Sequence, residues 1–484
     1  MEITMKKSFK IIYTALFFLL LFLPMALLPF FHNDASLEKR DLAEFPDYVS
    51  EGKLNLQFSD QFESWVSDHL PLRAQLLTAS NTVKGELLHG QTSNVIVGKD
   101  GWLFFASEGE SYMGINAMTD DEIKAFAVTL SLLQEQVEEN GGHFTFVPMP
   151  NKSSVYPEYM PAHYRQADET NLTRIQTALS NYDVNYTDML SVLTEHKDEG
   201  VYHRRDSHWN YRGALLGYDA ILSDISREHS DIKNIPYTVE QSWRGDLDKL
   251  LLPAGGVMDD QIIYSADHSD FMFTYPMGVR NTADQLAIFM SDREERDDLF
   301  STKNKDLNDG SNLLMARDSF GRALLPWMID SYETATFRRT DRPDVSKLPE
   351  GTDVVYEIAE RNLSRVIESA PFLYAPIREN ADLQSEKSSE TLSPVCETMG
   401  YGHHLYGALP EDTDTGDGRV YLLLEQNGKQ LCIEAFPIYE SKLLQGDGTK
   451  GFSAHLSNDL GLTGEWSLTV ITGNTAFSCY SIVF

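Results

Sequence analysis

The sequence predicts an α/β protein with a parallel sheet that helices cover on both faces. Short apolar runs at residues 144–147, 313–316 and 353–358 have the length of strands, and amphipathic helical segments alternate with them, which is typical of such sheets. Beyond residue 394 the chain holds strand-like runs joined by turns, which favours a C-terminal antiparallel β-sandwich. An almost uncharged apolar run at 11–31 predicts an N-terminal transmembrane helix.

Length and charge set the domain count and exclude one class of partner. The chain has 484 residues, which is too long for one ordinary domain. We expect a cytoplasmic stub with an anchor at 1–32, a main domain at 33–380, a polar linker at 381–394 and the β-sandwich at 395–484. The 73 Asp and Glu residues against 40 Lys and Arg residues give a formal net charge of −33, which repels nucleic acid. We therefore expect no nucleic-acid partner.

The N-terminal run carries the signals of an anchor. Lys6, Lys7 and Lys10 precede it, and a positive flank is retained on the cytoplasmic side of a membrane. A cleaved signal peptide has a shorter apolar centre followed by small residues, and this run has neither feature. The pattern favours an uncleaved single-pass anchor over a cleaved leader, with most of the chain outside the cytoplasm.

The three cysteines, Cys396, Cys432 and Cys479, all lie in the last fifth of the chain. Outside the cytoplasm one pair could form a disulfide, and the odd count leaves one thiol over. Buried free thiols are an equally good interpretation, so the pairing stays open.

Caps and turns mark the elements in the first half of the chain. Residues 58–77 have apolar side chains near helical spacing, and residues 94–105 have a Gly-rich turn between two apolar segments, which indicates a hairpin. A capping box at the start of 119–140 and two glycines after its end predict a helix. A second helix is expected at 169–179 and a short strand at 184–186.

The second half continues the alternation and then changes. Asn210 is placed to cap a helix over 211–225, and a helix at 320–329 follows the strand at 313–316. The acidic section at 259–309 is expected to be a surface insertion. In the C-terminal part, Asn427-Gly428 joins two strand-like runs and is the strongest short hairpin signal, and further strands are expected at 466–472 and 477–484.

Two short motifs supply the groups of a nucleophilic serine site. Asp206 and His208 are two residues apart, so a turn can bring the carboxylate to the imidazole, and Ser319 can supply the hydroxyl. Ser319 follows a strand and precedes a helix, where backbone N–H groups favour developing negative charge. Alone, each motif has a plain structural alternative: a helix N-cap for Ser319 and a surface turn with a hydrogen-bonded imidazole for His208.

Metal binding is a weaker interpretation of the same residues. His203, Asp206 and His208 are of ligand type, but no further ligand follows at a suitable spacing. We therefore predict no metal and no cofactor.

The motifs resemble those of one known family. Asp206-x-His208-Trp209 and Asp318-Ser319-Phe320 resemble the SGNH-hydrolase-like family of the alginate O-acetylation proteins AlgX and AlgJ and the related DHHW proteins. Further matches are Gly213-Ala214, Asp68 to Arg73, Gly98 to Phe104, Pro150 to Lys152, Tyr156-Pro157, Gly245 to Leu247 and Glu360-Arg361. The resemblance implies a flavodoxin-like SGNH fold and a Ser319–His208–Asp206 triad.

The resemblance also implies a reaction and its partners. It implies transfer of an acetyl group through an acetyl-serine to an exported polysaccharide, with a membrane-bound O-acyltransferase as the acetyl donor. We expect Asn151, Lys152 and Arg317 near the oxyanion or substrate, although each is also explained as a loop cap or a solvated charge. Trp209 and Tyr156 are candidates for a sugar platform or for the core.

Two alternatives to the transferase remain. An acetyl-esterase would use the same three groups with water as the acceptor, and the sequence does not separate it from a transferase. A non-catalytic glycan-binding assembly factor would retain the fold without bringing Asp206, His208 and Ser319 together. The C-terminal domain is expected to bind glycan or to serve as a docking or structural module.

Overall fold

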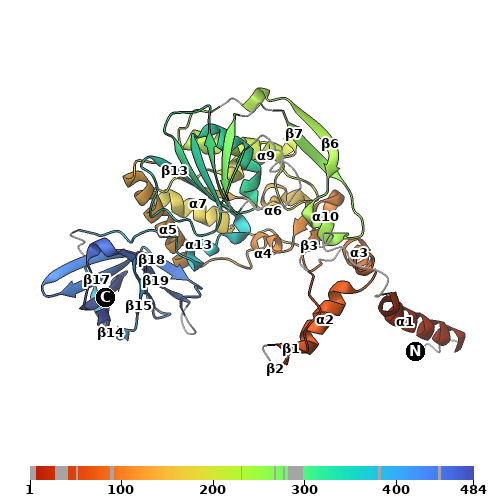
Figure 1. Ribbon diagram of the computed structural model, residues 1–484, viewed down its shortest axis with the longest axis horizontal. Helices are drawn as coiled ribbons and strands as arrows, with labels where there is room; N and C mark the ends of the chain where they lie inside the picture. Colours follow the sequence, from red (N-terminus) through yellow and green to blue (C-terminus); the bar gives the residue numbers. More distant parts are fainter. Residues whose placement is uncertain are drawn as a thin grey trace.

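The computed structural model describes residues 7–27, 42–50, 53–87, 92–229, 232–265, 269–275, 278–281, 298–379, 383–444 and 449–484. Its described residues build a seven-stranded sheet and a nine-stranded sheet, besides three two-stranded pairs. Figure 1 shows the seven-stranded sheet in the centre, the C-terminal sheet on one side, and helices α1 (Lys7–Leu27) and α2 (Phe58–His69) on the other.

The larger domain is built on a sheet with the strand order β5-β13-β11-β12-β10-β8-β9. Four neighbouring strands are parallel: β5 (Phe144–Met149), β13 (Thr352–Ala359), β11 (Asn312–Arg317) and β12 (Thr334–Arg339). Three antiparallel strands extend it: β10 (Leu299–Asn304), β8 (Phe271–Tyr275) and β9 (Gly278–Asn281). The predicted α/β fold is confirmed, with the correction that the sheet is mixed rather than wholly parallel.

Helices cover both faces of this sheet. On one face α5 (Asp120–Glu139) and α7 (Asn171–Asn181) pack in one apolar cluster with alternate side chains of β13. On the other face α8 (Met189–Glu195) and α9 (Tyr211–Asp224) pack in a second cluster with the intervening side chains. The shorter helices are α3 (Arg73–Thr82), α4 (Glu108–Tyr112), α6 (Lys152–Val155), α10 (Asp246–Leu251), α12 (Leu325–Met328) and α13 (Arg365–Glu368).

Local sequence signals account for several of these elements. The capping box predicted at the start of α5 is present, with Thr119 accepting from Glu122 N and Glu122 accepting from Thr119 N. The predicted hairpin is β3 (Val95–Val97) paired with β4 (Leu103–Phe105).

Other elements differ from the prediction. Residues 184–186 hold one isolated bridge instead of a strand, because only Tyr186 pairs with β5. The predicted helix at 320–329 is a run of short 3₁₀ and α turns.

Two predicted segments need correction. The section at 259–309 contains β7 (Asp259–Tyr264), which pairs with β6 (Tyr237–Trp243), and the sheet strands β8 and β10. It is therefore part of the fold and not only a surface insertion, although residues 282–297 lie outside the described residues. The predicted linker likewise contains a strand, β14 (Glu386–Leu392), at the edge of the C-terminal sheet. Most side chains of this strand are exposed, so its sequence is polar like that of a linker.

Residues 11–27 of the predicted transmembrane run lie in α1, and residues 28–31 lie outside the described residues. Among the described helices, none is long and apolar enough to span a membrane. The anchor is thus not supported by the structure and stays a prediction.

The C-terminal domain is a nine-stranded sheet that is antiparallel except for the parallel pair of β14 and β21 (Thr475–Cys479), and its strand β18 (Lys429–Tyr439) pairs with different strands along its length. Its first half pairs with β17 (Val420–Gln426), and its second half pairs with β19 (Lys450–Ser457). Asn427 and Gly428 both have positive φ, as the predicted two-residue turn requires. The other strands are β15 (Val395–Met399), β16 (Gly402–Ala408), β20 (Glu465–Thr472), β21 (Thr475–Cys479) and β22 (Ile482–Val483). The three cysteines are free and half-buried.

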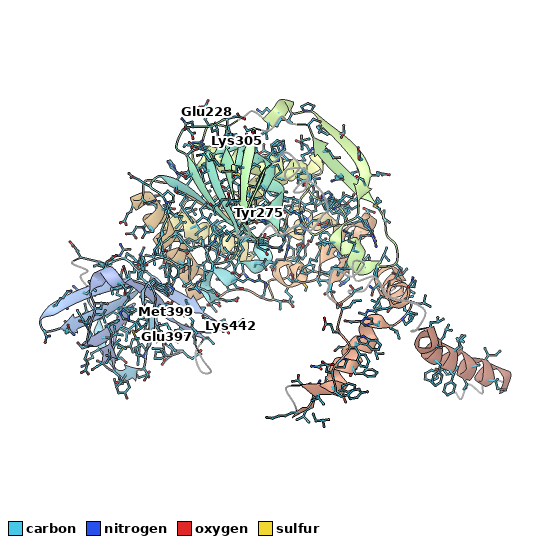
Figure 2. The ribbon with its side chains drawn as sticks, viewed as in Figure 1. Glu228, Tyr275, Lys305, Glu397, Met399 and Lys442 are labelled. Carbon is cyan, nitrogen blue, oxygen red and sulfur yellow. The ribbon has the colours of Figure 1, made fainter. Side chains whose placement is uncertain are left out.

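The two domains share a packed interface. Phe436 and Ile438 of β18 lie in the same apolar cluster as the buried face of α5. Arg378 forms ion pairs with Glu135 of α5 and with Glu434 of β18. Figure 2 shows Tyr275 at the large sheet, and Glu397 and Met399 on the C-terminal domain.

Candidate active site

The structure brings Ser319, His208 and Asp206 together at the carboxyl end of the large sheet. Ser319 directly follows Asp318, which comes after β11, and His208 lies in the segment before α9. His208 Nε2 is 2.9 Å from Ser319 Oγ, and His208 Nδ1 is 2.7 Å from Asp206 Oδ1. These are hydrogen-bond distances, so hydroxyl, imidazole and carboxylate form one chain of contacts.

The two-residue spacing of Asp206 and His208 fixes their relative position. The carboxylate of Asp206 accepts the backbone N–H of His208 at 3.0 Å, which is a local side-chain turn. Its second oxygen accepts from Trp243 Nε1 at 3.1 Å and from the backbone N–H of Asp246 at 2.9 Å. Both carboxylate oxygens therefore accept hydrogen bonds from groups other than the imidazole, and these bonds fix the orientation of the Asp206 side chain.

These contacts set the charges of the pair. Burial alone would raise the pKa of Asp206, but the hydrogen bond from His208 and the charges of the imidazoles outweigh it, so this pKa lies well below its usual range. Burial would lower the pKa of His208, but the hydrogen bond to Asp206 and the charges of Asp206 and Asp246 raise it. The site thus stabilises an imidazolium beside a carboxylate.

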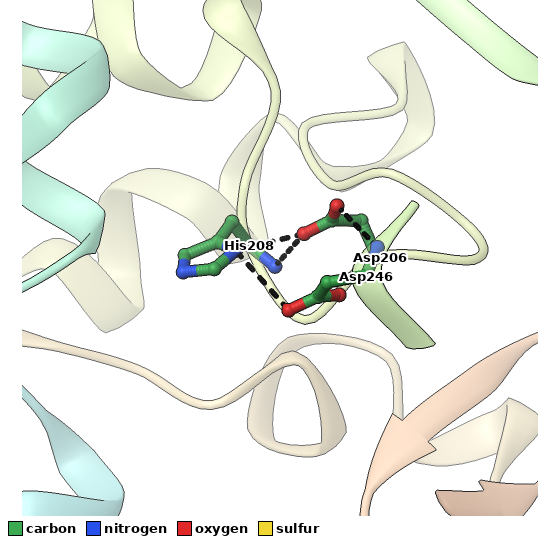
Figure 3. Close-up of side chains that lie close together, drawn as sticks. All are labelled: Asp206, His208 and Asp246. Atoms are coloured by element: carbon green, nitrogen blue, oxygen red, sulfur yellow. Dashed lines mark hydrogen bonds and ion pairs between the residues drawn. The ribbon is translucent and has the colours of Figure 1, made fainter. Parts of the chain in front are cut away.

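A second carboxylate lies at the same imidazole. Asp246 Oδ2 is 3.7 Å from His208 Nδ1, and Figure 3 shows it beside Asp206. Asp246 accepts from the backbone N–H of Ser207 at 2.7 Å and from the Ser207 hydroxyl at 2.6 Å. Burial and the neighbouring Asp206 raise the pKa of Asp246. Sequence reasoning did not select this residue, although it lies in one of the motifs that support the family resemblance.

The turn that carries Ser319 is fixed to β13. Glu357 Oε2 accepts the backbone N–H groups of Asp318 and Gly321, each at 3.0 Å. Asp318 accepts the backbone N–H of Phe320 at 2.9 Å. Arg317 is fully buried, and its Nη1 donates to the Asp318 carbonyl at 2.8 Å. Arg317 therefore supports the turn from inside and does not face a substrate, which corrects the expectation placed on it.

Three further expected site residues are buried in the core. Trp209 is 2% exposed and donates its Nε1–H to the Phe320 carbonyl at 3.0 Å. Tyr156 is 4% exposed, and its hydroxyl donates to the Lys197 carbonyl and accepts from Val201 N. Lys152 is 0% exposed. The burial of Trp209 and Tyr156 agrees with the core alternative given for them, whereas the burial of Lys152 corrects the expectation that it lies near the oxyanion or substrate.

Asn151 behaves differently from these three. It follows β5, it is 1% exposed, and both polar atoms of its side-chain amide are buried without a hydrogen-bond partner. Its backbone N–H donates to Glu360 Oε2 at 2.8 Å, which ties it to the end of the neighbouring strand β13. An unpaired buried amide costs free energy, which makes the Asn151 side chain a candidate for a ligand contact at the carboxyl end of the sheet.

Arg361 is a second donor that sequence reasoning did not assign to the site. Its guanidinium lies over the Phe320 ring at 5.1 Å and over the Phe105 ring at 5.5 Å. Its buried Nη1 has no hydrogen-bond partner. Its charge lowers the pKa of Asp318 and opposes the rise in the pKa of His208. The signal for it was the Glu360-Arg361 pair directly after a strand.

The side chains of this site that are able to bind a metal ion already form hydrogen bonds with protein groups. Among the described residues, Asp206, His208 and Asp246 are the group whose ligand atoms lie within 4.8 Å of one another. The carboxylates accept from backbone, indole and hydroxyl donors, and the imidazole contacts Asp206 and Ser319. We therefore interpret this group as a hydrogen-bond network.

Comparisons with known proteins agree with the motifs. Residues 95–257 match the family described as SGNH hydrolase-like domain, acetyltransferase AlgX. A protein of Pseudomonas aeruginosa named probable alginate O-acetylase AlgJ is 24% identical over 178 residues, which is 36% of this chain and 44% of that protein. The chain thus spans less than half the length of this relative.

Two solved structures are similar to this chain. A DHHW family protein from Eubacterium siraeum is 20% identical, with a TM-score of 0.41 over 56% of this chain and 93% of that one. PatB1 of Bacillus cereus is 18% identical, with a TM-score of 0.44 over 55% of this chain and 95% of that one. The match of residues 95–257 confirms the resemblance to the SGNH hydrolase-like proteins of the AlgX and AlgJ type.

Proposed function

We propose that this protein is an O-acetyltransferase that acts on a polysaccharide through Ser319, His208 and Asp206. The observation that carries the proposal is the contact of His208 with Ser319 at 2.9 Å and with Asp206 at 2.7 Å. The similarity to the AlgX domain and to a probable alginate O-acetylase supports the reaction class. The non-catalytic alternative expects these three side chains to lie apart, and the two distances disfavour it.

The reaction has two balanced steps. His208 Nε2 takes the Ser319 proton as Oγ attacks the acetyl carbonyl, and the leaving group of the donor departs with that proton. The resulting acetyl-serine is attacked by a sugar hydroxyl, whose proton passes to His208 and then to Ser319 Oγ as the acetyl group leaves. Asp206 and Asp246 stabilise the imidazolium in both steps, because both carboxylates lie at Nδ1.

The developing oxyanion needs donors at the end of the sheet. We assign this role to the backbone N–H of Ser319 and the side-chain amide of Asn151, whose buried donor has no partner of its own. Arg361 is the third candidate, since its unpaired Nη1 belongs to a cation stacked on Phe320. Lys152 and Arg317 are left out of this role because they are buried and donate to backbone carbonyls.

The cellular setting is part of the proposal. Lys6, Lys7 and Lys10 before the apolar run at 11–31 motivate a single-pass anchor, with the bulk of the chain outside the cytoplasm. Acetyl groups are made inside the cell, so a membrane-bound O-acyltransferase is the proposed donor. The C-terminal domain is proposed to hold the glycan.

The test is acetylation of Ser319. The full chain is incubated with 4-nitrophenyl acetate and analysed by mass spectrometry, and we expect one added acetyl group on Ser319. Ser319→Ala should lose the adduct and at least about 10³-fold of the hydrolysis rate, while the exposed Ser467→Ala should retain both. Activity that persists in Ser319→Ala would contradict the assignment.

A second arm separates transfer from hydrolysis. An oligosaccharide acceptor is added, and the products are identified as acetylated sugar or free acetate. Acetylated sugar is the expected product. Free acetate alone, at every acceptor concentration, identifies an acetyl-esterase instead.

A further inference from the structure

Lys152 is a buried cation whose side chain contacts backbone carbonyl groups of the segment 203–206, called the catalytic segment here because it contains Asp206. It is the first residue of α6, and its side chain has no exposed surface. Its Nζ donates to the carbonyl oxygens of His203 at 3.1 Å, Arg204 at 3.2 Å and Asp206 at 2.5 Å. An ammonium has three hydrogens, so the segment 203–206 accounts for all of them.

This arrangement separates two tasks within the site. The side chain of Asp206 orients the imidazole of His208, as described above, whereas Lys152 fixes the backbone that carries Asp206. Three acceptors within one short segment determine its path closely, because each carbonyl must point at the same nitrogen. A displaced segment would move His208 away from Ser319.

The surroundings of Lys152 are partly apolar and partly acidic. The rings of Trp102 and Phe104 lie 5.7 and 5.4 Å from Nζ. Burial lowers the pKa of Lys152 to about 8, against the opposing charges of nearby carboxylates. Four carboxylates raise this pKa, each from a different part of the chain: Glu108 of α4, Asp206 of the catalytic segment, Asp246 of α10 and Asp259 of β7. The imidazole of His203 is also close, and the charge of Lys152 lowers the pKa of His203.

We propose that Lys152 is a positioning residue whose ammonium holds the 203–206 segment in the geometry that lets His208 reach Ser319. The proposal rests on the proposed Ser319 chemistry. A neutral amine has two hydrogens and a lone pair, so one of the three carbonyls would face the lone pair and be repelled. Activity should therefore need the charged form and fall as the pH rises past about 8, near the pKa of this ammonium.

Unfolding does not explain such an alkaline loss. The pKa of Lys152 is lower in the folded chain than in an unfolded one, so the unfolded chain binds more protons between about pH 8 and the ordinary lysine value. The contribution of Lys152 to stability therefore rises with pH in this window. Activity and stability should change in opposite directions as far as Lys152 controls them.

Asp259 offers a test that leaves the catalytic groups intact. Its charge raises the pKa of Lys152, and its Oδ2 accepts the backbone N–H of Arg205 at 3.0 Å, which an asparagine oxygen can still do. In Asp259→Asn the alkaline limb of kcat/KM for 4-nitrophenyl acetate should move to lower pH, with activity at pH 6.5 retained. Asp260→Asn, at the exposed neighbouring position, is the matched control and should not move it. An alkaline limb that Asp259→Asn leaves in place would overturn the proposal.

Lys152→Met removes the charge and keeps most of the volume. We expect kcat to fall about 100-fold with little change in KM, since Lys152 has no exposed surface at which a substrate could bind. A folded variant with wild-type kcat and wild-type alkaline limb would contradict the proposal, and circular dichroism checks the fold. If Lys152→Met does not fold, the Asp259→Asn profile decides.

The two proposals fail in different ways. If Ser319→Ala still hydrolyses the ester, the proposed function is wrong. If hydrolysis needs Ser319 but the alkaline limb of kcat/KM is unchanged in Asp259→Asn, only the proposed role of Lys152 is wrong.

Discussion

At the residue scale, His208 lies between one hydroxyl and two carboxylates. Asp206 makes the direct contact at 2.7 Å, and Asp246 lies 3.7 Å from the same nitrogen. Both charges raise the pKa of His208 against its burial. A general base must be neutral, so kcat/KM should fall as the pH drops through this raised value, above the ordinary 6.5 of histidine.

Replacing Asp246 tests the second carboxylate. In Asp246→Asn one charge that raises the pKa of His208 is lost, so the acid limb of kcat/KM should move to lower pH, with a rate loss of roughly 10-fold. Asp246 also raises the pKa of Lys152, so the alkaline limb should move in the same direction. The measurement is the full pH profile with 4-nitrophenyl acetate.

Asp259→Asn is the comparison for this variant. Asp259 raises the pKa of Lys152 but is not among the main charges that act on His208, so it should move the alkaline limb alone. If Asp246→Asn leaves the acid limb unchanged, Asp246 is not part of the acid–base system. It would then serve only to hold Ser207.

Residue chemistry explains which site groups the sequence could predict. The two short motifs predict a nucleophilic serine site, because few other kinds of site combine a serine, a histidine and an aspartate. Asp246 and Arg361 could not be selected in this way, since a carboxylate or a guanidinium is usually solvated. Lys152 is expected at the substrate because it follows a strand, and Tyr156 is a candidate for a sugar platform or for the core. Their burial depends on the packing of α6 against neighbouring segments, which no local pattern specifies.

At the element scale, the turn that carries Ser319 is held by contacts from a neighbouring strand. Glu357 of β13 accepts two backbone N–H groups of the turn, and Gly321 lies against it. A Cβ on Gly321 would lie 2.7 Å from Glu357 Oε2 and 2.7 Å from the Cβ of Arg317. The glycine is needed here because three buried segments meet without room for a side chain.

Gly321→Ala should therefore distort the turn. We expect the free energy of unfolding to fall by about 1–3 kcal/mol, the usual cost of overpacking, and kcat to fall more than about 10-fold as Ser319 shifts. Gly255→Ala is the control, because a Cβ there would meet nothing within 4 Å. Urea denaturation and the ester assay provide the two readouts. Wild-type values for Gly321→Ala would show that the turn tolerates the side chain.

The same scale shows why parts of the sheet were predicted and parts were not. β5 and β13 are buried at every position, so they appear in the sequence as continuous apolar runs. β10 alternates between buried and less buried positions. Polar and charged side chains such as Ser301 and Lys303 therefore interrupt its apolar pattern, and the sequence does not show a continuous apolar run there. Antiparallel strands also need no helix between them, so the alternation of strands and helices does not reveal them.

At the scale of the whole molecule, a charged cluster and an apolar cluster join the C-terminal domain to the larger domain. Arg378 Nε is 2.5 Å from Glu434 Oε2, and the same guanidinium pairs with Glu135 of α5. The Glu434 side chain is 1% exposed, and Arg419 contacts its other oxygen. A buried carboxylate needs its partners, because an uncompensated charge in this environment is strongly unfavourable.

Arg378→Ala should weaken this interface. It leaves Glu434 with one arginine instead of two and removes the partner of Glu135, so we expect the free energy of unfolding to fall by about 2–4 kcal/mol. Arg365→Ala is the control, because its ion pair with Asp341 is long at 4.0 Å and more than half of the arginine side chain is exposed. That variant should stay within about 1 kcal/mol of the wild type.

The stability that Arg378 contributes should also depend on pH. The hydrogen bond from Arg378 is the largest cause that lowers the pKa of Glu135, so this contribution is complete above the ordinary glutamate value of 4.5 and is lost as the pH falls through the lowered one. The difference in unfolding free energy between wild type and Arg378→Ala should therefore shrink below about pH 4. A difference that stays constant from pH 7 to pH 3 would assign the effect of Arg378 to packing of its carbon chain, and not to the charges that join the two domains.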